Sequence, residues 1–95
     1  MKVRYTVQAQ SDLDAIFNHL DQRSPAGAQS VKNLIDRRIA GLAEFPFMAP
    51  VTEEPDIREL TILRYPYKVY YEVQSDEVWI IHIRHAARQQ WPEAD

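Results

Sequence analysis

The chain has 95 residues, of which 45% are hydrophobic, and it carries a formal net charge of −3. We expect one compact domain, residues 1–95, because this length leaves no room for a second core and the apolar fraction is that of a globular protein. The chain contains no cysteine, which excludes disulfide bonds, a thiol nucleophile and cysteine-based metal sites. We expect no cofactor and no bound metal.

The sequence also predicts a cytoplasmic protein without membrane contact. No apolar run approaches the roughly 20 residues that a membrane span needs, and the N-terminal stretch MKVRYTVQ lacks the apolar core of a signal peptide. A negative net charge argues against a protein that clamps nucleic acid mainly through its phosphates. Basic residues nevertheless gather in the C-terminal half, so a local basic surface remains open: Arg58, Arg64, Lys68, Arg84 and Arg88.

The first half of the chain predicts a strand followed by two helices. Apolar and polar residues alternate over residues 2–7, which is the period of a half-buried strand. Ser11 is a candidate N-cap for a first helix, whose apolar stripe contains Leu13, Ile16, Phe17 and Leu20. Ser24-Pro25 predicts the start of a second helix that runs to about Ala43 or Glu44. The short link at residues 21–24 should make the two helices an antiparallel hairpin.

The second half predicts strands. Prolines at 46 and 50 end the second helix, and residues 57–63 (IRELTIL) follow as a strand. Residues 65–88 then give the strongest signal, two strands rich in β-branched and aromatic residues with a turn at Ser75-Asp76-Glu77. The second of these strands is apolar on both faces through Ile81, which predicts a central position. The order β-α-α-β-β-β predicts an α+β fold, with the N-terminal strand and the helical hairpin packed on a small, mainly antiparallel sheet.

Three polar residues at the end of this hairpin are candidates for function. Arg84, His85 and Arg88 follow the buried strand and form a basic cluster that suits nucleic acid or catalysis. A purely structural interpretation stays open, in which Arg58, Lys68 and Arg88 pair with acidic residues on neighbouring strands, at about 0.2–1 kcal/mol each. Trp91 either folds back on the domain or contacts a partner.

The motifs of the chain, in their order and spacing, resemble those of the RelE/ParE superfamily of toxins from bacterial type II toxin–antitoxin modules. The resemblance covers nearly the whole chain. It includes Ile57-Arg58-Glu59-Leu60, the segment Tyr65-Pro66-Tyr67-Lys68-Val69-Tyr70-Tyr71, and the ending His85-Ala86-Ala87-Arg88. It implies a toxin fold with the element order predicted above.

The resemblance implies two alternative targets. RelE-like members cut messenger RNA on the ribosome, and on that interpretation the catalytic candidates are Lys68, His85, Arg88 and Arg58. ParE-like members poison DNA gyrase and need an interaction surface in place of a catalytic set. The acidic chain, the acidic loop before Ile57 and the absence of a tyrosine after Arg88 favour the ParE-like branch. A third hypothesis is a toxin that has lost activity and survives as a partner-binding domain.

The resemblance also implies a cognate antitoxin, with which the chain would form a heterotetramer or larger assembly. Specific DNA binding would belong to the antitoxin and not to this chain. The candidates for contact with a protein partner are Arg58, Lys68, Arg84, His85, Arg88 and Trp91.

Overall fold

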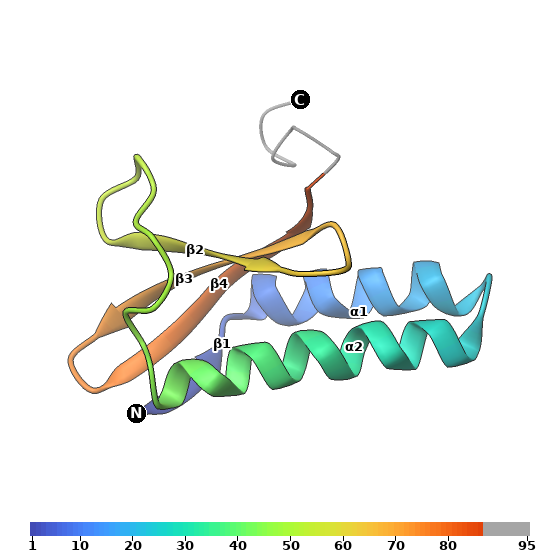
Figure 1. Cartoon of the computed structure of the whole chain (residues 1–95), viewed down its shortest axis with the longest axis horizontal. Coiled ribbons are helices and arrows are strands. Elements are labelled where there is room, and N and C mark those ends of the chain that lie inside the picture. The colour runs from blue at the N-terminus through green and yellow to red at the C-terminus, as the bar shows by residue number, and fades with distance from the viewer. Residues whose placement is uncertain (87–95) are drawn as a thin grey trace.

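The computed structural model describes residues 1–86 and places two helices on one face of a four-stranded sheet (Figure 1). The elements are β1 (Lys2–Tyr5), α1 (Val7–Asp21), α2 (Pro25–Ala40), a 3-10 turn (Gly41–Ala43), β2 (Ile57–Ile62), β3 (Tyr67–Gln74) and β4 (Glu77–His85). Arg88 and Trp91 lie outside the described residues.

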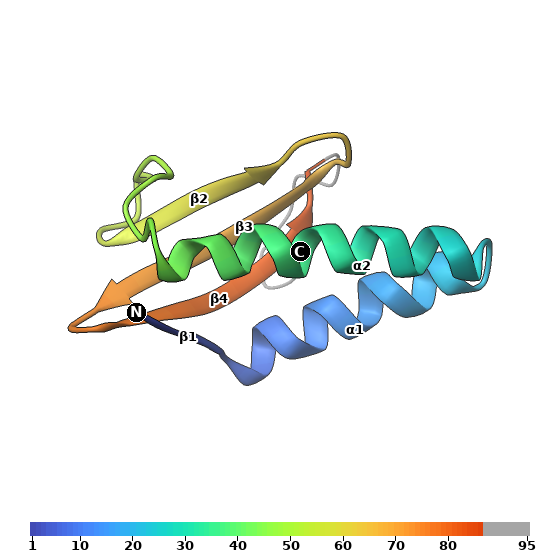
Figure 2. The same cartoon turned by 60° about the horizontal axis from the view of Figure 1, so that its bottom comes forward.

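The sheet has the strand order β1-β4-β3-β2, in which only the β1–β4 pair is parallel. The two helices run side by side in opposite directions over the same face of the sheet (Figure 2). The predicted α+β fold is confirmed, including the central position of β4. Strand β2 ends one residue earlier than expected. The second helix ends at Ala40, before the expected Ala43 or Glu44, because the chain tightens there into the 3-10 turn, in which the N–H of Glu44 bonds to the Gly41 carbonyl three residues back.

One apolar core holds the helical hairpin to the sheet. Side chains from α1 and α2, such as Leu13, Ile35 and Ile39, pack on Val69 and Tyr71 of β3 and on the inner residues of β4. Tyr71 is the largest of the fully buried side chains, and its hydroxyl donates a 2.8 Å hydrogen bond to the carbonyl of Pro46. Burial raises the pKa of Tyr71 above its usual value, so its hydroxyl stays a donor.

Strand β1 is tied to the helix layer as well as to the sheet. The hydroxyl of Tyr5 donates to the Asp36 carboxylate of α2 at 3.1 Å, and Lys32 pairs with the same carboxylate at 2.9 Å. Burial, together with the negative charge of Asp36, raises the pKa of Tyr5 well above its usual value. The short first strand is therefore held from two sides.

The first helix begins earlier than the sequence suggested. Our assignment of Ser11 as N-cap was wrong: the helix starts at Val7, and the N-cap is Thr6, whose Oγ1 accepts the N–H of Ala9 at 3.1 Å. The strand expected over residues 2–7 therefore ends at Tyr5. Ala9 is fully buried against the sheet, so an early start extends the apolar face of the helix by one turn. By contrast, Ser24 caps α2 with Pro25 in its first turn, as predicted.

A bulge in β4 decides which side chains face the helices. Tyr71 pairs with Ile80 and Tyr70 pairs with His82, so Ile81 has no partner on β3. The alternation of inward and outward side chains therefore shifts by one residue at this point. Beyond it, Ile83 and His85 turn towards the helices, whereas His82 and Arg84 lie on the opposite, open face of the sheet.

No helix within residues 1–86 is both long enough and apolar enough to cross a membrane.

The revised cap can be tested by stability measurements. Thr6→Ala should lower the free energy of unfolding by about 1–2 kcal/mol, because it removes the acceptor for the Ala9 N–H. It also removes the hydroxyl that donates to the Ile81 carbonyl. Ser11→Ala should leave stability unchanged or raise it by up to about 0.5 kcal/mol, because alanine is the better residue inside a helix. Urea unfolding of both variants distinguishes the two caps, and a larger loss for Ser11→Ala would contradict the assignment.

Candidate functional site

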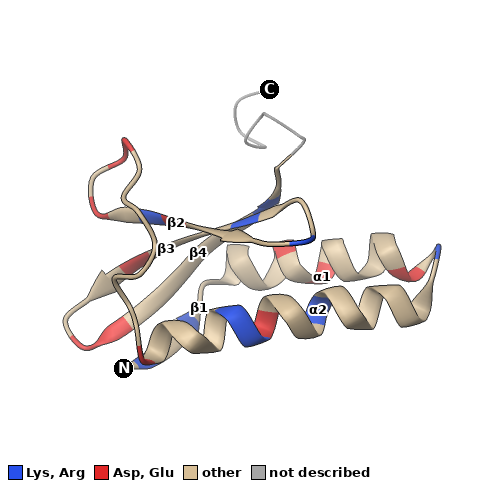
Figure 3. Cartoon of the chain, in the orientation of Figure 1, with Lys and Arg blue, Asp and Glu red and all other residues tan. Residues whose placement is uncertain are grey.

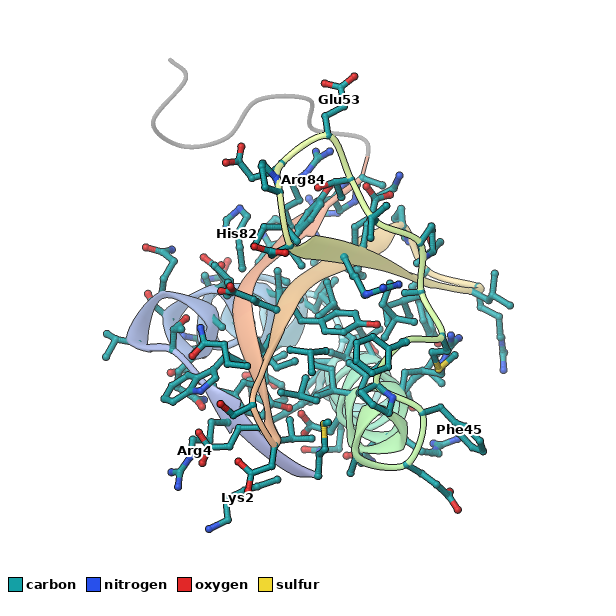
Figure 4. The ribbon with its side chains drawn as sticks, turned by 90° about the vertical axis from the view of Figure 1, so that its left-hand side faces the viewer. Lys2, Arg4, Phe45, Glu53, His82 and Arg84 are labelled. Carbon is teal, nitrogen blue, oxygen red and sulfur yellow. The ribbon has the colours of Figure 1, made fainter. Side chains whose placement is uncertain are left out.

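The open face of the sheet carries a cluster of polar side chains from three neighbouring strands. We call Glu59, Lys68, Tyr70, His82 and Arg84 the open-face cluster. Lys68 lies opposite Arg84 and Tyr70 lies opposite His82 in the β3–β4 register. Figure 4 shows His82 and Arg84 on the same stretch of β4. The strands thus bring two cations, an imidazole and a phenol onto one face.

The cluster is held together by specific contacts. Arg84 Nε donates to the Tyr70 hydroxyl at 3.1 Å, and its guanidinium carbon lies 5.6 Å from the centre of the Tyr70 ring. The Tyr70 and His82 rings stack with centroids 6.2 Å apart. Lys68 Nζ lies 2.6 Å from Glu59 Oε2. The charge of Lys68 is therefore largely balanced within the sheet, and Arg84 makes both a hydrogen bond and a cation–π contact with Tyr70.

A residue from α1 fixes the imidazole of this cluster. Asp12 Oδ2 lies 2.6 Å from His82 Nδ1 and also accepts the backbone N–H of Ile83 at 3.0 Å. Because a carboxylate only accepts, the Nδ1 atom of His82 carries the proton. The side chain of Asp12 is 12% exposed and that of His82 is 5% exposed, so this is a buried, charge-assisted contact.

Sequence reasoning missed both members of this pair. Neither Asp12 nor His82 was among the candidate residues, and His82 lies within an otherwise apolar strand. A signal was present, because a histidine inside an otherwise apolar strand needs a polar partner when it is buried. The partner itself, 70 residues away in the chain, could not be named without the tertiary structure.

The structure separates the predicted site residues. Arg84 and His85 are neighbours in the chain but lie on opposite faces of the sheet, so they form no common cluster.

The Nη1 atom of Arg58 donates to the carbonyls of Ala49 (2.7 Å) and Phe47 (3.3 Å) and so holds the loop before β2. Lys68 makes the cross-strand pair with Glu59 that the structural interpretation anticipated. Arg88 and Trp91 lie outside the described residues.

His85 lines a groove at the other face, between the helical hairpin and the adjoining ends of β3 and β4. Two adjoining cavities of about 340 and 260 Å³ form this groove, and both are lined by Leu20, Arg23, Tyr67 and His85. The Tyr67 and His85 rings meet edge to face at 5.2 Å. The described lining is mainly apolar, and its ionisable members are tyrosines and the potential cations His19, Arg23 and His85. Such a groove suits an apolar segment that carries negative charge.

Within residues 1–86, no three His, Asp or Glu side chains are placed to hold a metal ion together.

Comparison with known proteins agrees with this architecture. The family model of the ParE toxin of the type II toxin–antitoxin system parDE matches residues 3–90. The chain is 32% identical to the candidate toxin Y4kP of Sinorhizobium fredii over 97% of its own length and 94% of that protein. It is 36% identical to the toxin RelE2 of Caulobacter vibrioides over 92% of this chain and 97% of that protein.

Solved structures show the same fold. A chain of the chromosomal ParDE toxin–antitoxin system from P. aeruginosa matches with a TM-score of 0.81 and 27% identity, over 90% of this chain and 95% of that one. The E. coli RelBE toxin–antitoxin complex contains a chain that matches with a TM-score of 0.71 and 14% identity, over 92% and 98% of the two chains. At that identity the second likeness shows the fold alone.

The helical hairpin on a four-stranded sheet, together with these matches, defines a member of the RelE/ParE toxin superfamily. Within that superfamily the chain belongs to the ParE toxin family of type II toxin–antitoxin systems.

The Asp12–His82 contact should be essential to stability. Asp12→Asn should lower the free energy of unfolding by about 1–3 kcal/mol, because it removes the charge that the buried His82 N–H faces and weakens the acceptor for Ile83. Asp14→Asn, at an exposed aspartate two residues further along α1, should stay within about 0.5 kcal/mol of the parent. Urea unfolding at neutral pH measures both, and equal effects would contradict the proposed importance of Asp12.

Proposed function

We propose that this toxin arrests growth by poisoning DNA gyrase through protein contact, as the ParE-like branch does. The observation that carries the proposal is the separation of the residues that a RelE-like ribonuclease would need. Metal-free cleavage of RNA requires a base, an acid and cations around one phosphodiester. Lys68 and His85 lie on opposite faces of the sheet, and Arg58 is engaged by backbone carbonyls.

The family match supports the same target. The model that covers residues 3–90 is that of ParE toxins, and a ParDE structure matches with the higher TM-score of the two structural relatives described above. An interaction surface has no need of convergent catalytic groups, and an overall charge of −3 is no obstacle to contact with a protein. We assign the gyrase contact to the open-face cluster, in which Tyr70 positions Arg84 through a hydrogen bond and a cation–π contact.

One observation favours ribosome-dependent cleavage of messenger RNA as the second candidate. The open-face cluster combines Lys68 and Arg84 with the Tyr70 and His82 rings on a single surface. Two cations on one sheet face suit the phosphates of a bound RNA strand, whereas the Tyr70 and His82 rings are buried and support that face. The matching toxin named RelE2 is consistent with this alternative.

We further propose that a cognate antitoxin covers the groove between the helical hairpin and the sheet. Its apolar lining and potential cations suit a segment that brings apolar side chains and carboxylates and folds on binding. The expected product is a heterotetramer or a larger assembly in the cytoplasm.

Two assays on the purified chain decide the target. Gyrase supercoiling with detection of cleaved DNA complexes should show inhibition, and messenger RNA on programmed ribosomes should stay intact. Arg84→Ala should weaken gyrase inhibition by about tenfold or more if the open face makes the contact. Arg64→Ala, an exposed arginine in the turn before β3, serves as the control.

Ribosome-dependent cleavage that is lost on Lys68→Ala or Arg88→Ala, with gyrase unaffected, would replace the gyrase proposal by the ribonuclease. Harmless expression of the chain without its antitoxin would instead indicate an inactive, partner-binding domain.

The groove can be tested separately with the antitoxin encoded beside this gene. Arg23→Ala should weaken antitoxin binding by roughly five- to tenfold and reduce its salt dependence, because Arg23 lines both cavities. Arg37→Ala, an exposed residue further along α2, should leave the affinity unchanged. Calorimetric titration measures both variants, and equal affinities would place the antitoxin elsewhere.

A further inference from the structure

The loop between the 3-10 turn and β2 carries a concentrated apolar surface. Among residues 1–86, seven large hydrophobic side chains are exposed, and four of them lie between positions 45 and 51. They are Phe45 (61% exposed), Phe47 (60%), Met48 (52%) and Val51 (62%), which we call the loop patch. Single exposed apolar residues are ordinary on a protein surface, but four within seven positions indicate a contact site.

The backbone beneath the loop patch is fixed by the sheet. Arg58 holds the carbonyls of Phe47 and Ala49, and Tyr71 donates to the carbonyl of Pro46. The N–H of Glu59 bonds to the carbonyl of Pro50, which adds the loop to the edge of β2. Ala49 is buried, so the loop turns one small side chain inward while it directs the larger ones outward. The backbone of the loop patch is therefore already ordered, so binding of a partner costs little conformational entropy in the loop.

The charged side chains of the loop itself are all acidic. No lysine or arginine occurs in residues 39–57, whereas the same stretch contains Glu44, Glu53, Glu54 and Asp56, all exposed. Figure 3 shows the acidic tip of the loop, and Figure 4 places Phe45 and Glu53 at opposite ends of it. Two cations adjoin the loop and are both bound to its backbone carbonyls: Arg58 bonds to those of Phe47 and Ala49, and the N-terminal ammonium bonds to that of Ala43.

We propose that the loop patch is a second protein-binding surface and that it takes a cationic amphipathic segment of a partner protein. Apolar side chains of that segment would cover Phe45, Phe47, Met48 and Val51, and its lysines or arginines would meet the surrounding carboxylates. A second copy of this chain is disfavoured, because the same acidic rim would face itself. An anionic lipid surface is disfavoured for the same reason.

The loop patch is separate from the groove. The groove is lined by the start of α2, at Ser24, Gly27 and Val31, whereas the loop patch follows the end of that helix. The 16 residues of α2 span about 24 Å at 1.5 Å per residue, so the groove and the loop patch can be occupied at once. This proposal does not depend on whether gyrase or the ribosome is the target.

The experiment uses a synthetic helical peptide of about 18 residues, five turns, built from leucine and lysine, and the same peptide with glutamate in place of lysine. Fluorescence anisotropy with the purified full chain should show binding of the lysine peptide that weakens as salt rises, and no comparable binding of the glutamate peptide. Preference for the glutamate peptide, or no binding of either, would overturn the proposal.

Variants locate the binding on the loop. Phe45→Ser and Phe47→Ser should each weaken binding of the lysine peptide by about tenfold or more, whereas Leu63→Ser, an exposed leucine outside the patch, should not. The double variant Glu53→Gln/Glu54→Gln should flatten the salt dependence, in contrast to Asp14→Asn/Asp21→Asn on α1.

Two outcomes would contradict the assignment even if the lysine peptide binds. One is equal weakening by Leu63→Ser and by the loop variants, with all variants shown to be folded by circular dichroism. The other is self-association of the parent chain in sedimentation that Phe45→Ser abolishes, which would make a second copy the occupant.

Discussion

The rest of this structure depends on how the start of the first helix completes the free edge of β4. Strand β1 pairs with β4 only as far as Ile80, because the chain turns into a helix after Tyr5. From there Thr6 binds the carbonyls of Ile80 and Ile81, and Asp12 accepts the N–H of Ile83. Backbone groups that would otherwise be buried without partners are thereby satisfied. The same contacts hold α1 against the sheet, which shapes the groove on one face and orients His82 on the other.

The bulge at Ile81 decides which face each polar residue at the end of β4 joins. Strict alternation from Ile80 would have turned His82 and Arg84 into the core and His85 to the outside. The extra residue reverses that assignment, so that Arg84 joins Lys68 on the open face and His85 joins the groove. Strand alternation divides this basic run between two surfaces, and the one-residue shift decides which residue joins which surface. A protein that meets both an antitoxin and a cellular target can use this separation.

Three surfaces of different chemistry result on one small fold. The groove is apolar with potential cations, the open face combines cations with aromatic rings, and the loop patch is apolar within an acidic rim. Such differences let each surface select its partner by charge. Arg58 illustrates how closely structure and surface are linked: its guanidinium group lies 5.1 Å from the Phe47 ring and holds the carbonyls that keep the loop in place.

The sequence by itself determined the α+β class, the helical hairpin, the central strand and the toxin superfamily. These follow from local periodicity, from the Ser24-Pro25 start of a helix and from motifs whose order is readable along the chain. It did not determine the start of α1, because Thr6 and Ser11 are both acceptable caps and only the burial of Ala9 decides between them. Nor did it determine the bulge, the Asp12–His82 pair or which of Arg84 and His85 faces the helices. Those depend on contacts between residues far apart in the chain, and no local pattern records which strand residue will lack a partner.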